Sequence, residues 1–267
     1  MRTLKMVTLC FAVALVVSGL ATAVASASEG PKFIRCVKAA KVDGKYTGKY
    51  TDKACTKPAS EAEIEAGKTN KYEAVALAPS EEVSVTGKSK ATTIKTIGVN
   101  GNAETVVCKK DAFVGKLSND AYGGLVTGTF TFEDCEANGS KSDVCGNTKP
   151  GTIEYSPAQK QEVQWLEQGS KPGLDTPANP GPKFTCGSET VETGGTLVGT
   201  LENSSKGVNV LWKTSGGTQE DTRFFEEEEP GEWREESELN LFSRPSRAET
   251  TVVGTEEISA KGISVTN

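Results

Sequence analysis

The stretch LVTGTFTF, residues 125–132, decides the fold class of this chain of 267 residues. It alternates large apolar residues with threonine or glycine, and a period of two is typical of a strand that buries one face. Its β-branched and aromatic residues also favour strands over helices. The stretch therefore predicts a half-buried β-strand.

The same texture continues on both sides of this stretch. Beyond Lys68, runs rich in valine, isoleucine, threonine and aromatic residues alternate with breaks of glycine, asparagine and aspartate. Many short strands at regular spacing indicate a sandwich or a sheet closed on itself. We predict a mainly β protein with a β-sandwich-like body of short antiparallel strands. The predicted strands are 72–77, 82–86, 92–97, 104–108, 112–117, 125–133, 152–155, 162–167, 184–186, 196–201, 208–213, 249–254 and 263–266.

The first 27 residues have the three parts of a secretory signal peptide. Arg2 and Lys5 precede an apolar run at 6–17, and small residues follow with A-x-A patterns at 21–23 and 25–27. The apolar run is too short to span a bilayer comfortably, which disfavours the alternative of an uncleaved anchor. We expect cleavage after residue 27 and a secreted protein, free or envelope-associated, without a membrane span.

The cysteines agree with export. Without Cys10 there are six, an even number that indicates disulfide bonds outside the reducing cytosol. Six cysteines allow fifteen pairings, and sequence alone does not choose among them. Because short loops close most readily, the favoured pairing joins neighbours along the chain. The expected bonds are Cys36–Cys55, Cys108–Cys135 and Cys145–Cys186.

Residues 28–67 are predicted to form a small basic unit tied by Cys36 and Cys55. Between Lys32 and Lys57 the chain carries eight basic residues against two acids, and it repeats GKYT at 44–47 and 48–51. Glycine at every fourth position disfavours a helix and predicts a turn-rich loop or irregular hairpin. Residues 60–66 (SEAEIEA) carry a capping-box pattern that predicts a helical turn.

Residues 68–267 are expected to form the β-rich domain. Within it, the Pro/Gly-rich segment 168–182 is predicted to be an exposed connection or a boundary between two β halves. Residues 220–238 carry ten acids against two basic residues. Because residues 224–240 contain few apolar side chains to bury, we predict a mobile or extended segment there.

The composition excludes several chemistries. The chain has no histidine, so Ser-His-Asp and Cys-His catalysis and the usual zinc ligand sets are absent. Paired carboxylates are the remaining catalytic possibility, but the sequence does not single out a pair. We therefore assign no catalytic residues and no cofactor.

One weak metal pattern occurs just after the predicted strand at 125–133. Side-chain oxygens of Asp134, Glu136, Asn138 and Ser140 recur at alternate positions, as in a calcium loop. The twelfth position, where such a loop needs a bidentate glutamate, is Cys145. A polar turn between bridged cysteines explains the same residues.

A binding function is suggested by the repeated unit. Lys45, Tyr46, Lys49 and Tyr50 interleave cations with aromatic rings, which suits polyanions or glycans. For an exported protein the anion would be a cell-wall polymer or polysaccharide rather than a nucleic acid. The alternative is a solvated basic loop that offsets the acidic stretch near the C-terminus.

Two regions resemble a group of exported actinobacterial proteins. The likeness lies in FIRCVK at 33–38 with GKYTGKYTDKAC at 44–55, and in FTFEDCE at 130–136 with FTCG at 184–187. The group has no assigned activity, so the resemblance implies an extracytoplasmic location and no catalytic residues. The match is weaker after residue 207.

Three functions follow as alternatives. The first is a non-catalytic secreted or envelope-associated protein that binds extracellular polymers through its Lys/Tyr loop. The second is a carboxylate-dependent extracellular glycan hydrolase. The third is a structural matrix protein without a specific ligand.

Overall fold

The computed structural model describes residues 30–79, 81–89, 91–215, 218–229, 231–236, 241–244, 247–260 and 262–266. The predicted signal peptide therefore lies outside the described residues. The chain is mainly β, with one short helix among the described residues, and its sheets are built from antiparallel strands. The predicted fold class is confirmed.

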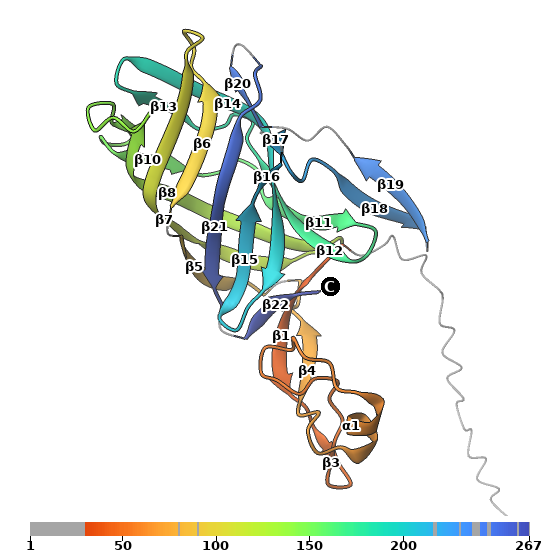
Figure 1. The fold of residues 1–267 in the computed structure, drawn as a ribbon. Helices are drawn as coiled ribbons and strands as arrows, with labels where there is room; N and C mark the ends of the chain where they lie inside the picture. Colours follow the sequence, from red (N-terminus) through yellow and green to blue (C-terminus); the bar gives the residue numbers. More distant parts are fainter. Residues whose placement is uncertain are drawn as a thin grey trace, which may run out of the picture.

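The main sheet closes on itself. Its strands follow the order β8, β7, β5, β21, β15, β14, β12 and β11, and β11 then pairs again with β8. Gln161 lies opposite Val126 at this closing contact. Figure 1 shows the strands wrapping around a common interior. The eight strands are β5 (Val83–Ser89), β7 (Ala103–Asn119), β8 (Gly124–Ala137), β11 (Gln161–Glu167), β12 (Lys171–Pro177), β14 (Glu189–Asn203), β15 (Gly207–Trp212) and β21 (Thr251–Ser259).

Further strands extend this body. Most of them pair with one of the eight strands of the closed sheet, and β16 and β17 form a separate two-stranded ribbon. Nearly all the predicted strands occur within a few residues of their expected bounds, but 104–108 and 112–117 are one continuous strand, β7. The further strands are β6 (Thr92–Ile97), β9 (Cys145–Gly146), β10 (Thr152–Tyr155), β13 (Lys183–Cys186), β16 (Thr214–Ser215), β17 (Thr218–Gln219), β18 (Phe224–Glu229), β19 (Glu232–Glu236) and β20 (Leu241–Arg244).

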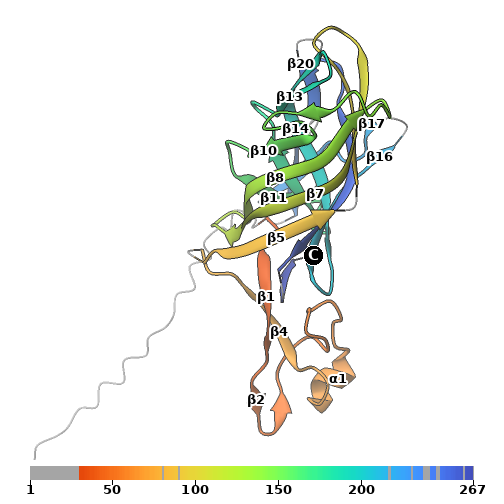
Figure 2. The ribbon, with the colours of Figure 1, turned by 90° about the vertical axis from the view of Figure 1, so that its left-hand side faces the viewer.

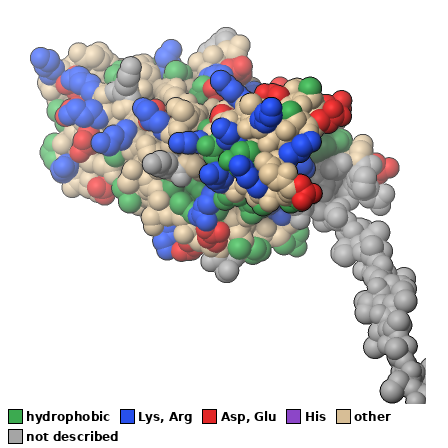
Figure 3. All heavy atoms as spheres, turned by 90° about the horizontal axis from the view of Figure 1, so that it is seen from below, with side chains coloured by type: hydrophobic (Ala, Val, Ile, Leu, Met, Phe, Trp, Pro, Cys, Tyr) green, Lys and Arg blue, Asp and Glu red, His purple; other side chains and the backbone are tan. Residues whose placement is uncertain are grey.

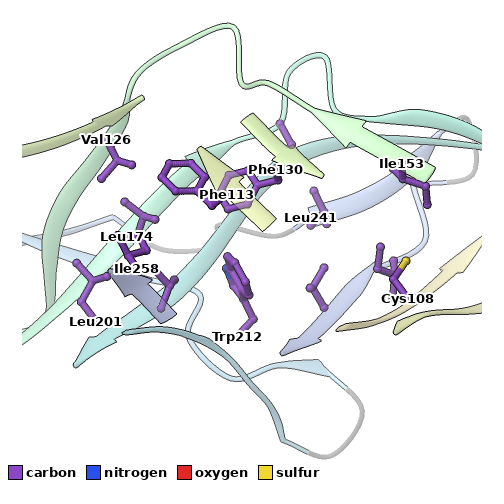
Figure 4. Packing of buried hydrophobic residues seen from close by; sticks show 14 of the residues in the cluster. Cys108, Phe113, Val126, Phe130, Ile153, Leu174, Leu201, Trp212, Leu241 and Ile258 are labelled. Atoms are coloured by element: carbon purple, nitrogen blue, oxygen red, sulfur yellow. The ribbon is translucent and has the colours of Figure 1, made fainter. Parts of the chain in front are cut away.

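Side chains fill the interior of the closed sheet. Phe113 on β7, Phe130 on β8 and Trp212 on β15 are all almost fully buried. The rings of Phe113 and Phe130 lie 4.8 Å apart between centroids, and Trp212 meets Phe130 edge-on at 6.0 Å. Figure 4 shows these rings among aliphatic side chains from strands on opposite sides of the sheet. Burial of this apolar surface is the main stabilising contribution to the body.

All three disulfide bonds pair as predicted. Cys36 bonds to Cys55 in the small unit, whereas the other two bonds lie in the body. Cys108–Cys135 joins β7 to β8, and Cys145–Cys186 joins β9 to β13.

A small three-stranded sheet connects the basic unit to the body. Its central strand β1 (Phe33–Lys38) pairs with β4 (Tyr72–Ala76) and with β22 (Ile263–Val265) near the other end of the chain. The hairpin of β2 (Lys41–Val42) and β3 (Lys45–Tyr46) and the helix α1 (Glu61–Ala66) complete the part below it. Residues 35–76, called the small unit here, project from the body in Figures 1 and 2.

The capped helical turn is confirmed. The Ser60 hydroxyl accepts from the Glu63 amide, while the Glu63 carboxylate accepts from the Ser60 amide. Gly67 ends the helix in the left-handed conformation, with φ of 62°.

The prediction of an exposed connection at 168–182 was wrong for its middle part. Lys171–Pro177 is strand β12, which pairs with β11 and β14 and buries Leu174 completely. Gly173 is required there, because a Cβ at this position would lie 2.5 Å from the Leu166 side chain. Gly173 thus allows close packing within a strand here and does not mark a loop.

The acidic segment was predicted to be mobile or extended, and the structure shows it extended. Strands β18 and β19 form a hairpin against the outer face of the body. Although this segment has few apolar side chains, Phe224 is buried and packs with Leu166 and Val198 in a second apolar cluster. That contact fixes the start of the hairpin on the body.

Candidate functional site

The small unit places the two repeats of GKYT differently. Lys45 and Tyr46 form strand β3, and the Lys45 Nζ donates to the Glu65 carbonyl at 2.9 Å, near the end of helix α1. Gly67 lies against the Lys45 side chain, because a Cβ there would come within 2.4 Å of it. Lys45 is therefore partly a packing residue.

The second repeat joins a different element. The amides of Lys49 and Tyr50 both donate to the Tyr72 carbonyl at 2.9 Å, which ties this repeat to the start of β4. The Lys49 side chain remains exposed, while the Tyr50 ring is half-buried. Gly48 is buried in this contact, since a Cβ would lie 2.4 Å from the Tyr72 oxygen.

A cation that the sequence prediction missed belongs to the same surface. The Lys41 Nζ lies 4.6 Å from the centroid of the Tyr46 ring, in a cation–π contact across the β2–β3 hairpin. Because side chains directly opposite each other in an antiparallel hairpin are neighbours, a predicted β2–β3 hairpin could have indicated this contact. Lys41 and Tyr46 are directly opposite in two short strands.

Hydrogen bonds brace the loops that carry these lysines. Asp52 accepts from the backbone amides of Ala54, Thr56 and Lys57. Burial alone would raise the pKa of Asp52, but these hydrogen bonds outweigh it and hold the pKa below its usual value. The fully buried Asn70 amide donates to two backbone carbonyls of the repeated segment. The basic surface is thus held in place rather than loosely attached.

The lysines of the small unit face solvent. Figure 3, which looks at the molecule from below, shows Lys and Arg side chains spread over this side. Within the part of the chain that the structure describes, none of these lysines forms an ion pair with a carboxylate. The exposed lysines are Lys38, Lys41, Lys45, Lys49, Lys53, Lys57, Lys68 and Lys71.

The calcium pattern does not have the backbone of a calcium loop. Asp134 and Glu136 lie in strand β8 and form ion pairs with Lys110 and Lys109, each at 3.1 Å. The Asn138 side chain bonds instead to Thr105 and Glu104, and Ser140 bonds to Ser142. Among the described residues, no group of three or more acidic or cysteine side chains is placed to hold a metal ion.

A groove lies where the acidic hairpin meets the body. Its volume is about 310 Å³, and aromatic and acidic side chains line it together. Tyr122, at the turn before β8, is largely exposed beside it, whereas Trp165 on β11 is nearly buried in its floor. The carboxylates of Glu162, Glu226 and Glu236 also reach the groove.

Asp175 lies next to this groove and has a perturbed pKa. It is the cross-strand neighbour of Glu162, and its Oδ1 atom is buried without a hydrogen-bond partner among the described residues. Burial first, and then the charges of Glu162 and Glu236, raise the pKa of Asp175 to about 7. A carboxyl group with such a pKa can hold a proton near neutral pH and donate it.

Sequence reasoning missed Asp175 because its segment was taken for a loop. Its position two residues from Pro177 carries no strand pattern. The burial arises from β11 and β14 on either side.

Comparison with known proteins gives no match to a family model, to a curated protein or to a solved structure. In the described part of the chain, no helix is long and apolar enough to cross a membrane. The three disulfide bonds fit a protein that matures outside the reducing cytosol.

Proposed function

We propose that this chain is a non-catalytic secreted protein that binds an anionic extracellular polymer through its small unit. The observation that carries the proposal is a set of exposed lysines, without ion pairs to carboxylates among the described residues, on a disulfide-braced unit that projects from the body. Bracing lowers the ordering cost of binding, because the loops do not have to be fixed when the polymer arrives.

The distribution of charge favours this unit over the rest of the surface. The whole chain has a net charge of −6, so a polyanion is repelled by most of the molecule. Attraction between exposed charges is screened within about 8–10 Å at moderate ionic strength. Projection therefore lets the lysines approach the polymer while the acidic body stays at a distance.

The tyrosines supply contacts that a purely ionic surface lacks. The Tyr46 and Tyr50 rings are half-buried, so each presents part of its surface to solvent. Aromatic surfaces pack against the apolar faces of sugar rings, and the Lys41–Tyr46 contact holds one ring in place. We thus favour a polymer that combines acidic groups with sugars, such as a wall polymer or acidic polysaccharide.

Charge reversal at two lysines whose side chains have no partner in the described part of the chain tests the proposal. Lys49→Glu combined with Lys53→Glu should weaken binding to immobilised polygalacturonate about tenfold at low salt, since exposed charges contribute roughly 0.2–1 kcal/mol each. The matched control is Lys141→Glu with Lys160→Glu, two exposed lysines of the body, which should change binding less than twofold. An equal loss of binding in both variants would show a non-specific charge effect and would contradict the proposal.

The groove beside Asp175 favours a second candidate, a carboxylate-dependent glycan hydrolase. A raised pKa on one carboxyl beside further acidic side chains is the arrangement that general acid catalysis needs, and aromatic residues line the adjacent groove. Here Asp175 would be the acid, and Glu162 or Glu236 the second carboxylate. Turnover on a panel of wall and plant polysaccharides, abolished by Asp175→Asn and kept by Glu154→Gln, would support it. Absence of turnover on the whole panel would reject it.

A further inference from the structure

Two acidic side chains lie inside the closed sheet, away from both surfaces discussed above. Asp111 on β7 is 5% exposed and Glu256 on β21 is 0% exposed. Both point inward, in line with buried apolar neighbours such as Phe113 and Ile258. A buried carboxylate without a partner is costly, so the pair requires an explanation.

The strand between them leaves room for their contact. Strand β5 separates β7 from β21 in the sheet, with Ser89 opposite Asp111 and Gly87 opposite Ile258. A Cβ on Gly87 would lie 2.1 Å from the Glu256 Oε1, so only glycine lets that carboxyl group extend across β5. Gly254 makes similar room for Thr92, whose hydroxyl donates to Asp111. The sequence is therefore adapted to hold polar groups here.

No cation balances these acids within the described residues. Lys88 on β5, Lys95 on β6 and Lys110 on β7 are exposed, and β15 has no ionisable residue. Glu257, next along β21, pairs with Lys206 at the surface. Of the ionisable groups on the surrounding strands, only Asp111 faces Glu256.

We infer that Asp111 and Glu256 form a carboxyl pair that shares one proton and makes the closed sheet sensitive to alkali. Glu256 carries the proton and donates it to Asp111, which also accepts the Thr92 hydroxyl. In the described part of the chain, both Glu256 oxygens otherwise lack hydrogen-bond partners. This fits a carboxyl group whose own proton makes its only hydrogen bond, to Asp111. Among the described residues, no third acidic side chain joins these two carboxyls to hold a metal ion.

The pKa of Glu256 agrees with this arrangement. Burial first, and then the hydrogen bond and charge of Asp111, raise its pKa to about 9. A carboxyl whose pKa is raised on folding contributes its full stability below the pKa of the unfolded chain, 4.5, and loses it as pH rises toward about 9. The fold should thus tolerate acid better than alkali.

Denaturant unfolding of the whole disulfide-bonded chain between pH 5 and 10 tests the inference. Between pH 7.5 and 8.5 the unfolding equilibrium constant should rise about tenfold, because the unfolded chain has released one more proton, and the rise should level off above about pH 9. Glu256→Gln keeps a donor to Asp111 at every pH, so it should remove this rise. The control Glu189→Gln alters a carboxylate whose pKa is lowered by hydrogen bonds from Asn100 and Asn102, and it should keep the rise. An unchanged slope in Glu256→Gln would overturn the inference.

A second measurement uses the unaltered protein and does not depend on the variant folding. Carbon-13 NMR of side-chain carboxyls should show one glutamate that stays protonated from pH 5 to 8. If every glutamate carboxyl is ionised at pH 7, the pair does not hold a proton and the inference fails. A signal that shifts only on addition of calcium would equally overturn it, in favour of a metal site.

Discussion

The small unit and the closed sheet are stabilised in opposite ways. The closed sheet buries a continuous apolar interior, whereas the small unit buries little beyond Ala39, Cys55 and Asn70 and depends on one disulfide and hydrogen bonds to backbone groups. A surface that carries no core is free to vary in its charges. This difference supports our proposal that the small unit is the part that recognises a polymer and that the sheet supports it.

The largest expected effect breaks the sheet. Phe113→Ala removes a fully buried ring that contacts Phe130, and we expect a loss of about 3–5 kcal/mol in the free energy of unfolding. Denaturant titration followed by Trp212 fluorescence measures it. The control Val114→Ala changes the next residue of the same strand, which is 64% exposed, and should cost under about 0.5 kcal/mol. Equal losses in the two variants would contradict the assignment of Phe113 to the buried face of β7 and Val114 to the exposed face.

The next effect breaks the small unit alone. Replacing Cys36 and Cys55 by alanine opens a bond that spans 19 residues and should destabilise the unit by about 3 kcal/mol. Hydrogen exchange should then become fast at the hydrogen-bonded amides of Tyr50 and Tyr72 and stay slow at the amides of β7. Loss of protection in the body as well would show that the two parts unfold together.

The two parts should also respond oppositely to pH. In the small unit, hydrogen bonds lower the pKa of Asp52, so its contribution is complete above its ordinary value of 3.8 and is lost as pH falls through the lowered pKa. Asp52→Ala removes both acceptor oxygens and should therefore speed amide exchange at Thr56 and Lys57 at pH 6, by an amount equivalent to about 1 kcal/mol per lost bond. In the body, Asp175→Asn should raise stability at pH 8, because the pKa of that carboxyl is raised to about 7. A shift of the same sign at both positions would contradict the assignment.

The smallest effect concerns the hairpin tip. Val42 is 57% exposed, so Val42→Ser should change stability by less than about 0.5 kcal/mol. It should also leave polyanion binding within twofold if lysines carry that binding. A large loss of binding would show that apolar contact at the tip matters more than charge.

The strands of the body could largely be predicted from the sequence, because a buried face leaves a period of two. The predicted strand at 249–254 ended before Glu256, although Glu256 continues the alternation of Val252 and Gly254 in the observed strand. Strand β12 could not be predicted, since its burial comes from β11 and β14 rather than from its own residues. The closing contact of β11 with β8 likewise joins strands whose pairing leaves no local pattern.

The candidate site was predictable in composition but not in detail. The repeated GKYT indicated the basic surface, yet the two copies differ because one packs beside α1 and the other pairs with β4. Nothing in the spacing distinguishes Lys45, held by the Glu65 carbonyl, from the free Lys49. Asp175 was missed for a related reason, because acids look alike until their surroundings are known.

Sedimentation of the whole chain with polygalacturonate-coated beads across a salt series tests the central claim most directly. We predict that the protein pellets with the beads at low salt, is released as salt rises, and stays in the supernatant when Lys49 and Lys53 are both changed to glutamate. A protein that remains in the supernatant at low salt, or whose binding ignores both salt and these lysines, would contradict the claim that the small unit binds anionic polymers.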